Sequence, residues 1–233
     1  IYNSSIKEIK YGYVNYKIPI TVFIKITSRC MFQCGFCSQG SSCTDEMNIT
    51  VIKLILKKLK RNGVLRIFYT GGEPFLHKNF LEILKYGKKL GFCQLVITNG
   101  YLLNSEKAKE ILECLDSVSI SLHGTKEYHN KVVGNTMAYD RVIEGIKLIK
   151  KEFPNLQMDI CYTATEENSN EHDIKSVADL CNKYEITFVI TRAYLIGKEK
   201  NKPANFNYIK NLDDIIKKLK VNGYKIEIGH CLV

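Results

Sequence analysis

The sequence predicts an α/β protein in which the strands of a parallel sheet are joined by helical crossovers. Short β-branched, apolar segments alternate about six times with segments whose apolar residues recur three or four positions apart. Polar, glycine-containing segments come directly after several of the predicted strands, where chemistry commonly sits in parallel sheets. This alternation alone does not separate an open doubly wound sheet from a partial or a closed barrel.

The first half of the chain contains three strand–helix pairs. Short runs rich in branched and aromatic residues predict strands over residues 20–26, 65–69 and 95–98. Apolar residues at helical spacing predict helices over residues 51–59, 80–90 and 108–115. Gly91 directly follows the second of these helices, and glycine commonly ends a helix at that position.

The second half repeats this order. Strands are predicted over residues 118–122, 156–163 and 186–191, with one further strand expected over 224–228. Helices are predicted over residues 142–153, 174–181 and 209–219. Pro154 closes the first of these helices, because proline cannot continue a helical hydrogen-bond ladder.

The charge of the chain does not by itself indicate a nucleic-acid partner. The net charge is +10 over 233 residues, but the excess is mostly lysine scattered between apolar residues on predicted helices. No arginine cluster or basic tract with interleaved aromatics is visible, so nucleic acid is not favoured, and a mildly acidic peptide would suit the charge equally well. No apolar run approaches the ~20 residues of a membrane helix, and no secretory signal is visible, which favours the cytoplasm.

Three of the nine cysteines lie within eight residues, directly after the first predicted strand. Cys30, Cys34 and Cys37 form a C-x3-C-x2-C run, and thiolates at this spacing suit zinc or an iron–sulfur cluster. Three ligands in one loop can hold three irons of a 4Fe–4S cube and leave the fourth iron without a protein ligand. Gly35 gives this loop conformational freedom, and Phe36 would shield the metal from water.

A zinc site is the alternative interpretation of the same cysteines. Structural zinc normally takes four protein ligands, and Cys43 could serve as the fourth. The other cysteines do not share this spacing. Cys93, Cys114, Cys161 and Cys181 fall among apolar neighbours and are expected to pack in the core, and Cys231 lies apart, near the end of the chain.

Three further motifs end predicted strands. Gly71-Gly72-Glu73-Pro74 lets the backbone approach a ligand closely, and its glutamate can accept a hydrogen bond from an ammonium group. Thr98 and Asn99 end the third strand, where they also read as a turn. Ser119 and Ser121 end the fourth strand with small hydroxyl groups that could reach a ribose or a carboxylate. Taken alone, each motif is also compatible with an ordinary turn.

Together, the cysteine run and the Gly-Gly-Glu-Pro turn resemble the signature of the radical S-adenosylmethionine superfamily, over approximately residues 20–200. The resemblance implies a partial (β/α)6 TIM-like barrel of parallel strands with outer helices. It implies a 4Fe–4S cluster on Cys30, Cys34 and Cys37 whose open iron binds S-adenosylmethionine. One electron, from a donor such as flavodoxin or ferredoxin, would then cleave the cofactor to a 5′-deoxyadenosyl radical that abstracts hydrogen from a substrate.

The resemblance also implies which residues contact the cofactor. They are Gly71, Gly72, Glu73, Pro74, Thr98, Asn99, Ser119, Ser121 and Leu195. Two residues depart from the family pattern: His123 replaces a usual aspartate, and Val133 stands where many relatives carry an arginine that pairs with the cofactor's carboxylate. Lys131 is a candidate for the missing cation.

The Ser-Leu-His-Gly segment at 121–124 and the Tyr-Asp-Arg-Val segment at 139–142 resemble the peptide- and protein-modifying (SPASM/twitch-type) branch. This implies a peptide or protein substrate that is crosslinked, epimerised or oxidised. The alternatives are the same chemistry on a small metabolite, a glycyl-radical enzyme activase, and a non-catalytic zinc or electron-transfer module, in which the Gly-Gly-Glu-Pro turn has no role.

The expected organisation has three parts. Residues 1–19 form an N-terminal arm or hairpin, and residues 20–200 form the core barrel. Residues 201–233 form a final helix and strand and can be the start of a truncated C-terminal extension.

Overall fold

The computed structural model describes residues 19–37, 45–192 and 207–229, and within them seven strands form one parallel sheet. The strands lie in chain order: β1 (Thr21–Thr27), β2 (Arg66–Gly71), β3 (Cys93–Thr98), β4 (Ser117–Ser121), β5 (Gln157–Ala164), β6 (Thr187–Arg192) and β7 (Ile226–Ile228). Every pairing between neighbours is parallel, and no pairing within the described ranges joins β7 back to β1. The predicted parallel α/β architecture is confirmed, and the sheet is open.

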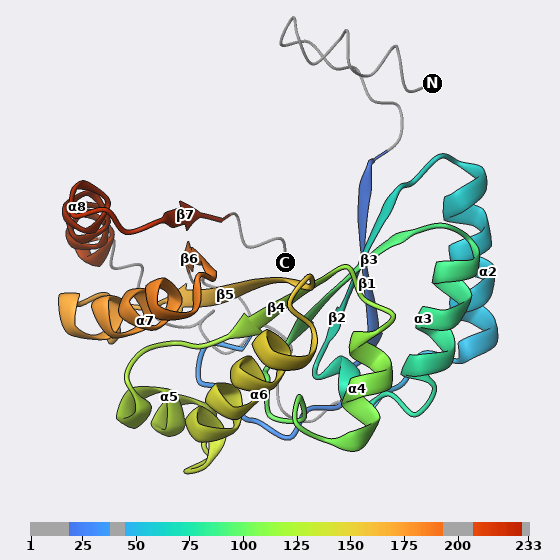
Figure 1. Ribbon diagram of the computed structural model, residues 1–233, viewed down its shortest axis with the longest axis horizontal. Helices are drawn as coiled ribbons and strands as arrows, with labels where there is room; N and C mark the ends of the chain where they lie inside the picture. The colour runs from blue at the N-terminus through green and yellow to red at the C-terminus, as the bar shows by residue number, and fades with distance from the viewer. Residues whose placement is uncertain (1–18, 38–44, 193–206, 230–233) are drawn as a thin grey trace, which may run out of the picture.

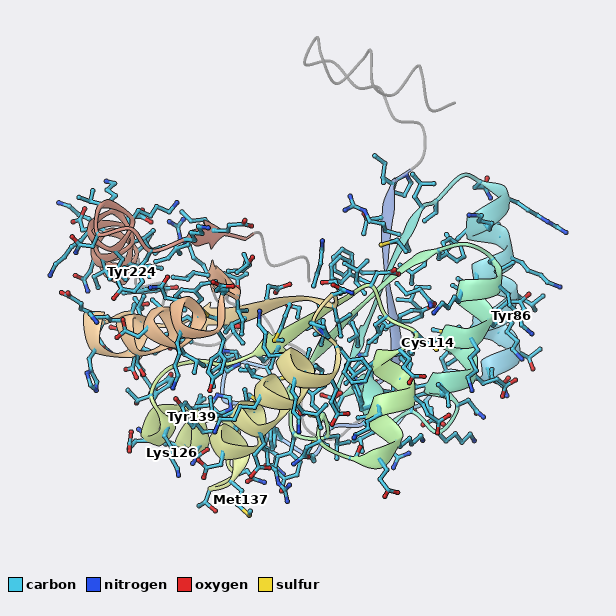
Figure 2. All side chains as sticks on the ribbon, viewed as in Figure 1. Tyr86, Cys114, Lys126, Met137, Tyr139 and Tyr224 are labelled. Carbon is cyan, nitrogen blue, oxygen red and sulfur yellow. The ribbon has the colours of Figure 1, made fainter. Side chains whose placement is uncertain are left out.

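Helices cover the outer side of the curved sheet (Figure 1). They are α2 (Ile49–Arg61), η1 (Pro74–Leu76), α3 (Phe80–Lys89), α4 (Glu106–Leu112), α5 (Lys126–Val133), α6 (Ala138–Glu152), α7 (Glu171–Tyr184) and α8 (Asn207–Val221). Figure 2 shows nitrogen- and oxygen-tipped side chains projecting outward from this layer, as expected for lysines spread over exposed helix faces. No helix in the described ranges is long and apolar enough to cross a membrane.

The hydrophobic core lies between the sheet and these helices. Alternate residues of each strand point to this side. Ile67, Val96, Val118, Ile160 and Ile190 are examples from successive strands, and all are fully or almost fully buried. The opposite, concave side of the sheet carries the stacked rings of Phe23 and Phe68, whose centroids lie 4.7 Å apart. Because the hydrophobic core lies on the outer side of the sheet, the concave side is available for functional groups.

Helix α5 was not predicted, because its sequence has no apolar stripe. Only His129 and Val133 of this helix are buried, and its other side chains are polar or partly exposed. Both ends of the helix have common capping residues. The Thr125 side chain accepts a hydrogen bond from the Tyr128 amide at the first turn, and Gly134 ends the helix at a φ of 72°. This short helix packs beside the cysteine loop and therefore belongs to the functional site.

A buried glutamine ties three elements of the core together. The Gln94 Oε1 atom accepts from the Tyr69 hydroxyl at 2.9 Å. Its Nε2 atom donates to the carbonyl oxygens of Leu84, at 2.9 Å, and Cys114, at 3.0 Å. Gln94 is fully buried, and these three contacts give its side-chain oxygen and nitrogen atoms protein partners in place of water.

Replacing Gln94 with leucine is expected to lower the free energy of unfolding by roughly 3 kcal/mol, because the Tyr69 hydroxyl and two carbonyl groups lose buried partners. Urea unfolding followed by circular dichroism measures this loss. Gln157→Leu is the matched control, since Gln157 is exposed at the start of β5. A loss no larger than that of the control would contradict the role assigned to Gln94.

Candidate active site

The cysteine loop leaves the end of β1 and runs along the carboxyl edge of the sheet. Cys30 is exposed, Cys34 and Cys37 are partly buried, and none of the three forms a disulfide. The Phe32 amide and the Asn99 side-chain amide approach the Cys30 sulfur at 3.4 Å and 3.8 Å. Although the residue as a whole is exposed, desolvation of its thiol raises the pKa of Cys30, and the hydrogen bond from the Phe32 amide opposes this shift.

Backbone contacts hold this loop on both sides. The Ser28 amide donates to the Asp45 carbonyl at 2.7 Å. On the other side, the Gln33 and Gly35 amides each donate at 3.3 Å to carbonyls at the end of α5, those of Val133 and Val132. The loop is therefore positioned by contacts that involve no cysteine side chain.

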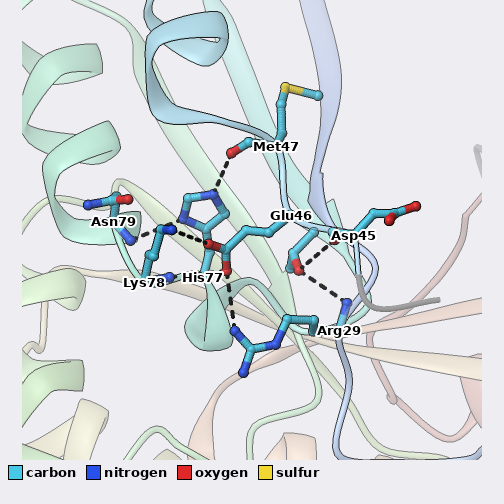
Figure 3. A network of polar contacts seen from close by, with 8 residues as sticks. Arg29, Asp45, Glu46, Met47, His77, Lys78 and Asn79 are labelled. Carbon is cyan, nitrogen blue, oxygen red and sulfur yellow. Dashed lines mark hydrogen bonds and ion pairs between the residues drawn. The ribbon is translucent and has the colours of Figure 1, made fainter. Parts of the chain in front are cut away.

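A polar network ties the start of the loop to the segment that follows β2 (Figure 3). Glu46 pairs with Arg29 at 3.4 Å and with the Lys78 ammonium at 3.8 Å. Next to Lys78, the buried His77 ring contacts the Met47 carbonyl through Nε2 at 2.9 Å and accepts the Asn79 amide through Nδ1 at 3.1 Å. Both ring nitrogens of His77 are therefore engaged by the backbone, which gives His77 a structural role.

Gly71 and Gly72 bring the end of β2 against the first residues of the cysteine loop. The Gly72 amide donates to the Thr27 carbonyl at 2.8 Å, and the Glu73 amide to the Arg29 carbonyl at 2.7 Å. A Cβ atom on Gly71 would lie 2.1 Å from the Thr27 oxygen, and one on Gly72 would lie 2.2 Å from the Arg29 oxygen. Only glycine allows this approach to the cysteine loop. The predicted approach of this backbone to a ligand stays a prediction.

The Glu73 side chain accepts hydrogen bonds from residues at the end of the neighbouring strand, β3. Its carboxylate accepts from the Phe75 amide at 3.1 Å, the Thr98 hydroxyl at 2.9 Å and the Asn99 amide at 2.7 Å. Glu73 is fully buried, and burial raises its pKa to about 7 although these three donors lower it. In this structure Glu73 positions Thr98 and Asn99, and its direct contact with a ligand stays a prediction.

The raised pKa of Glu73 predicts a pH-dependent stability. Between its ordinary value of 4.5 and about 7, the unfolded chain releases this proton while the folded chain keeps it. The stabilising contribution is complete below pH 4.5 and is lost as the pH rises through 7. Glu73→Gln is therefore expected to destabilise the protein more at about pH 5 than at about pH 7.5, by roughly 2 kcal/mol. Urea unfolding at both pH values tests this, and equal pH dependence in the two proteins would contradict it.

A cavity at the carboxyl edge of the sheet brings most of the predicted residues together. Its wall includes Cys30, Cys34, Cys37, Gly71, Gly72, Thr98, Asn99 and Ser121. Pro74 and Glu73 lie behind this wall, fully or almost fully buried. Ser119 lies deeper on β4, where its hydroxyl donates to Asp159 at 2.5 Å. Leu195, Cys43, Cys231 and the arm at 1–18 lie outside the described residues.

Several residues of this wall were not predicted from the sequence. Ser28, Thr70 and Thr163 line the cavity, as do Phe32 and His129. Val133, at a position that the family resemblance places near the cofactor, also lines it. Thr70 and Thr163 fall at strand ends, as Ser121 does, so this position was a usable signal for them. His129 and Val133 lie on the unpredicted α5, whose place beside the cysteines is a tertiary feature.

The chemistry of the donor set fits an iron–sulfur cluster. Three thiols line one cavity, and cysteine sulfur is the ligand that holds iron–sulfur clusters in proteins. Within the loop, Phe32 is buried, and Phe36 packs edge-on against His123 with ring centroids 4.8 Å apart. These rings give the site apolar surroundings.

Comparison with known proteins points to one superfamily. The family model described as Radical SAM superfamily matches residues 24–181. The chain is 36% identical over 127 residues to the probable GTP 3′,8-cyclase of Saccharolobus solfataricus, covering 53% of this chain and 41% of that protein. It is 28% identical over 168 residues to the PqqA peptide cyclase of Bradyrhizobium diazoefficiens, covering 70% of this chain and 43% of that protein. The chain spans about half the length of the curated relatives it matches.

Among solved structures, SuiB of Streptococcus suis shares the fold. The structure of SuiB bound to S-adenosylmethionine matches with a TM-score of 0.76 at 19% identity, covering 97% of this chain and 53% of that chain. SuiB is also known bound to its precursor peptide SuiA. This likeness extends over almost all of the present chain, and it shows a common architecture.

Proposed function

The chain belongs to the radical S-adenosylmethionine superfamily, and from this premise we propose that Cys30, Cys34 and Cys37 bind a 4Fe–4S cluster. The observation that carries the proposal is the cavity that these cysteines share with Gly71, Gly72 and the end of β3. When bound, the cluster and S-adenosylmethionine supply a one-electron cleavage that yields a 5′-deoxyadenosyl radical, which removes a hydrogen atom from the substrate.

The protein's own groups hold and shield this chemistry. The three thiolates would bind three irons and would leave one coordination position for the cofactor. The Asn99 amide near the Cys30 sulfur, and the rings of Phe32 and Phe36, tune the site by hydrogen bonding and by exclusion of water. The close backbone approach at Gly72 holds the start of the cysteine loop against the end of β2.

We propose a peptide or protein as the substrate. The Ser-Leu-His-Gly and Tyr-Asp-Arg-Val segments, the similarity to PqqA peptide cyclase and the fold shared with SuiB support this class. The open concave side of the sheet suits a substrate that inserts one side chain, with Phe23 and Phe68 at one side and the Ser119–Asp159 pair at the other. A small metabolite such as a nucleotide is the second candidate, favoured by the similarity to a GTP cyclase.

The electron source and compartment follow from the same chemistry. A flavodoxin or ferredoxin is the proposed donor, because the reaction needs single electrons and Cys30 is exposed at the surface. Thiolate-bound iron–sulfur clusters persist in reducing compartments, which favours the cytoplasm.

Anaerobic reconstitution tests the central proposal. The chain, loaded with iron and sulfide and given S-adenosylmethionine and dithionite, is expected to contain about four irons and four sulfides and to release 5′-deoxyadenosine. Omitting dithionite or S-adenosylmethionine is the control and should stop release. Stoichiometric zinc with no 5′-deoxyadenosine would overturn the proposal and favour a zinc or electron-transfer module.

Isotope transfer tests the substrate class. Tryptic peptides from cells grown in deuterium oxide are incubated with the reconstituted enzyme, and 5′-deoxyadenosine is analysed by mass spectrometry. Deuterium in the nucleoside supports a peptide substrate. Deuterium transfer from deuterated GTP, with none from peptides, supports the small-molecule alternative.

A further inference from the structure

Strands β1 and β2 carry a regular pattern of side chains on the concave side of the sheet. Their intervening residues, such as Ile24 and Ile67, are buried in the core on the other side. Three neighbouring pairs in the parallel register point to the concave side: Lys25 with Thr70, Phe23 with Phe68, and Thr21 with Arg66. Each outer pair joins a cation to a hydroxyl group, and the middle pair is the aromatic stack. We call these six side chains the β1–β2 face.

The two cations of the β1–β2 face are available to a ligand. Lys25 and Arg66 are exposed, and no carboxylate of the described residues forms an ion pair with either. Asp116, which like Arg66 lies near Cys93, instead accepts the Gln94 amide at 2.7 Å. The phenyl and threonine side chains of the face are partly exposed. The face therefore presents two positive charges on either side of an apolar centre.

The far side of the concave surface has the opposite charge. Among the described strand residues that point to this surface, the other charged ones are Asp159 of β5 and Glu227 of β7. Burial raises the pKa of Asp159, and the neighbouring Glu227 carboxylate adds to this shift. No lysine, arginine, aspartate or glutamate is among the described residues of the cavity wall. An acidic group on the concave side is therefore attracted to β1 and β2 and repelled from β5 and β7.

The spacing of the β1–β2 face matches that of an extended peptide. Alternate residues of a parallel strand lie ~6.6 Å apart along it, so the two outer pairs stand ~13 Å apart. An extended peptide has nearly the same rise per residue, and its alternate side chains point to one side. Residues i and i+4 of such a peptide can therefore reach the two cations while residue i+2 meets the phenyl rings.

The β1–β2 face continues into the cavity that contains the cysteines. Thr70 belongs to both the face and the cavity wall, and Gly71 and Gly72 of the wall follow it directly. Lys25 precedes Cys30 by five residues in the sequence. A peptide bound on this face thus has one end beside the proposed cluster, where its reacting residue can enter the cavity.

We propose that the β1–β2 face binds an extended segment of the peptide substrate with the pattern acidic–x–apolar–x–acidic. Each carboxylate meets the cation and the threonine hydroxyl of one outer pair, and the apolar side chain packs on the phenyl rings of the middle pair. The inference rests on the proposed function, and it names a sequence feature that the substrate carries next to its reacting residue.

Peptide binding to the unaltered chain tests the pattern. The chain is reconstituted anaerobically with iron and sulfide, S-adenosylmethionine is added, and affinity is measured by fluorescence anisotropy. A labelled peptide containing Glu-Ser-Phe-Ser-Glu is expected to bind about fivefold more tightly than one containing Glu-Glu-Phe-Ser-Ser, which has the same composition but can reach only one cation. A peptide containing Lys-Ser-Phe-Ser-Lys should bind more weakly than both.

Variants test the assignment of the two cations. Lys25→Met and Arg66→Met should each weaken binding of the Glu-Ser-Phe-Ser-Glu peptide about fivefold, because each removes one charge from the face. Lys25→Glu should instead prefer a peptide in which one of the two glutamates is replaced by lysine. Lys57→Met is the matched control, since Lys57 is an exposed lysine of α2 on the outer layer, and its affinity should be unchanged.

The outcomes separate this inference from the proposed function. Equal affinity for the Glu-Ser-Phe-Ser-Glu and Glu-Glu-Phe-Ser-Ser peptides, or an equal loss in Lys57→Met and Lys25→Met, would overturn the peptide pattern while 5′-deoxyadenosine is still released. GTP binding that weakens in Lys25→Met and Arg66→Met, with no peptide bound, would also overturn it and assign the face to a nucleotide. Absence of a cluster and of nucleoside release would overturn the proposed function itself.

Discussion

Alanine in place of Cys30, Cys34 or Cys37 should lower 5′-deoxyadenosine formation below about 0.1% of the rate of the unaltered chain, a barrier increase of at least about 4 kcal/mol. Each thiolate is proposed to hold one iron of the cluster, and loss of one leaves an incomplete, oxygen-sensitive site. Iron and sulfide content, the electron paramagnetic resonance signal after reduction and the rate of nucleoside release measure the effect. All three should fall together.

Cys114→Ala is the matched control for this series. Cys114 is partly buried just after α4 on the outer layer (Figure 2), outside the cavity wall. It should retain iron, sulfide and nucleoside release. Full activity in any of the three loop variants, or loss of activity in Cys114→Ala, would contradict the assignment of the cluster ligands.

Gly72→Ala should both destabilise the fold and impair the site. The new Cβ atom would lie 2.2 Å from the Arg29 carbonyl oxygen and 2.6 Å from that of Ser28, and backbone cannot give way as a flexible side chain can. We expect the free energy of unfolding to fall by about 2–4 kcal/mol, because the end of β2 and the cysteine loop must separate. Urea unfolding and iron incorporation, measured on the same preparation, report the two effects.

Gly35→Ala provides the comparison within the cysteine loop. A Cβ atom on Gly35 would have no heavy atom within 4 Å, and the φ angle of this residue is outside the left-handed region. Its stability should change by less than about 1 kcal/mol. If Gly72→Ala and Gly35→Ala prove equally stable and bind equal iron, the close contact at Gly72 does not constrain the site.

The sequence predicted most of the sheet and its outer helices, because these elements bury a periodic apolar face. The observed ends of strands differ from the predicted ends where a strand pairs with a segment that is distant in the sequence. Strand β3 begins at Cys93, two residues earlier than predicted, since the Cys93 amide pairs with the Leu65 carbonyl of a distant segment. Helix α5 was missed because two buried residues on a polar segment make no detectable period.

The site was partly predictable for a different reason. Cys30 and Gly72 follow strands and Thr98 ends one, and parallel strands bring such positions to one edge. The sequence did not predict which residues of neighbouring strands lie opposite one another, or how deeply each side chain of the site is buried. Ser119 and Ser121 share a face of β4, but only the structure shows that Ser119 lies opposite Asp159 of β5 and is engaged by it.

The cysteine loop is held by contacts that do not depend on its cysteine side chains. Its start is tied to Asp45 and Glu46, and its middle to the last carbonyls of α5. Small zinc modules differ, since their binding energy must also organise an otherwise unfolded chain. Here the loop already loses much of its conformational entropy when the polypeptide folds, so metal binding by the proposed thiolate ligands would not have to supply that ordering.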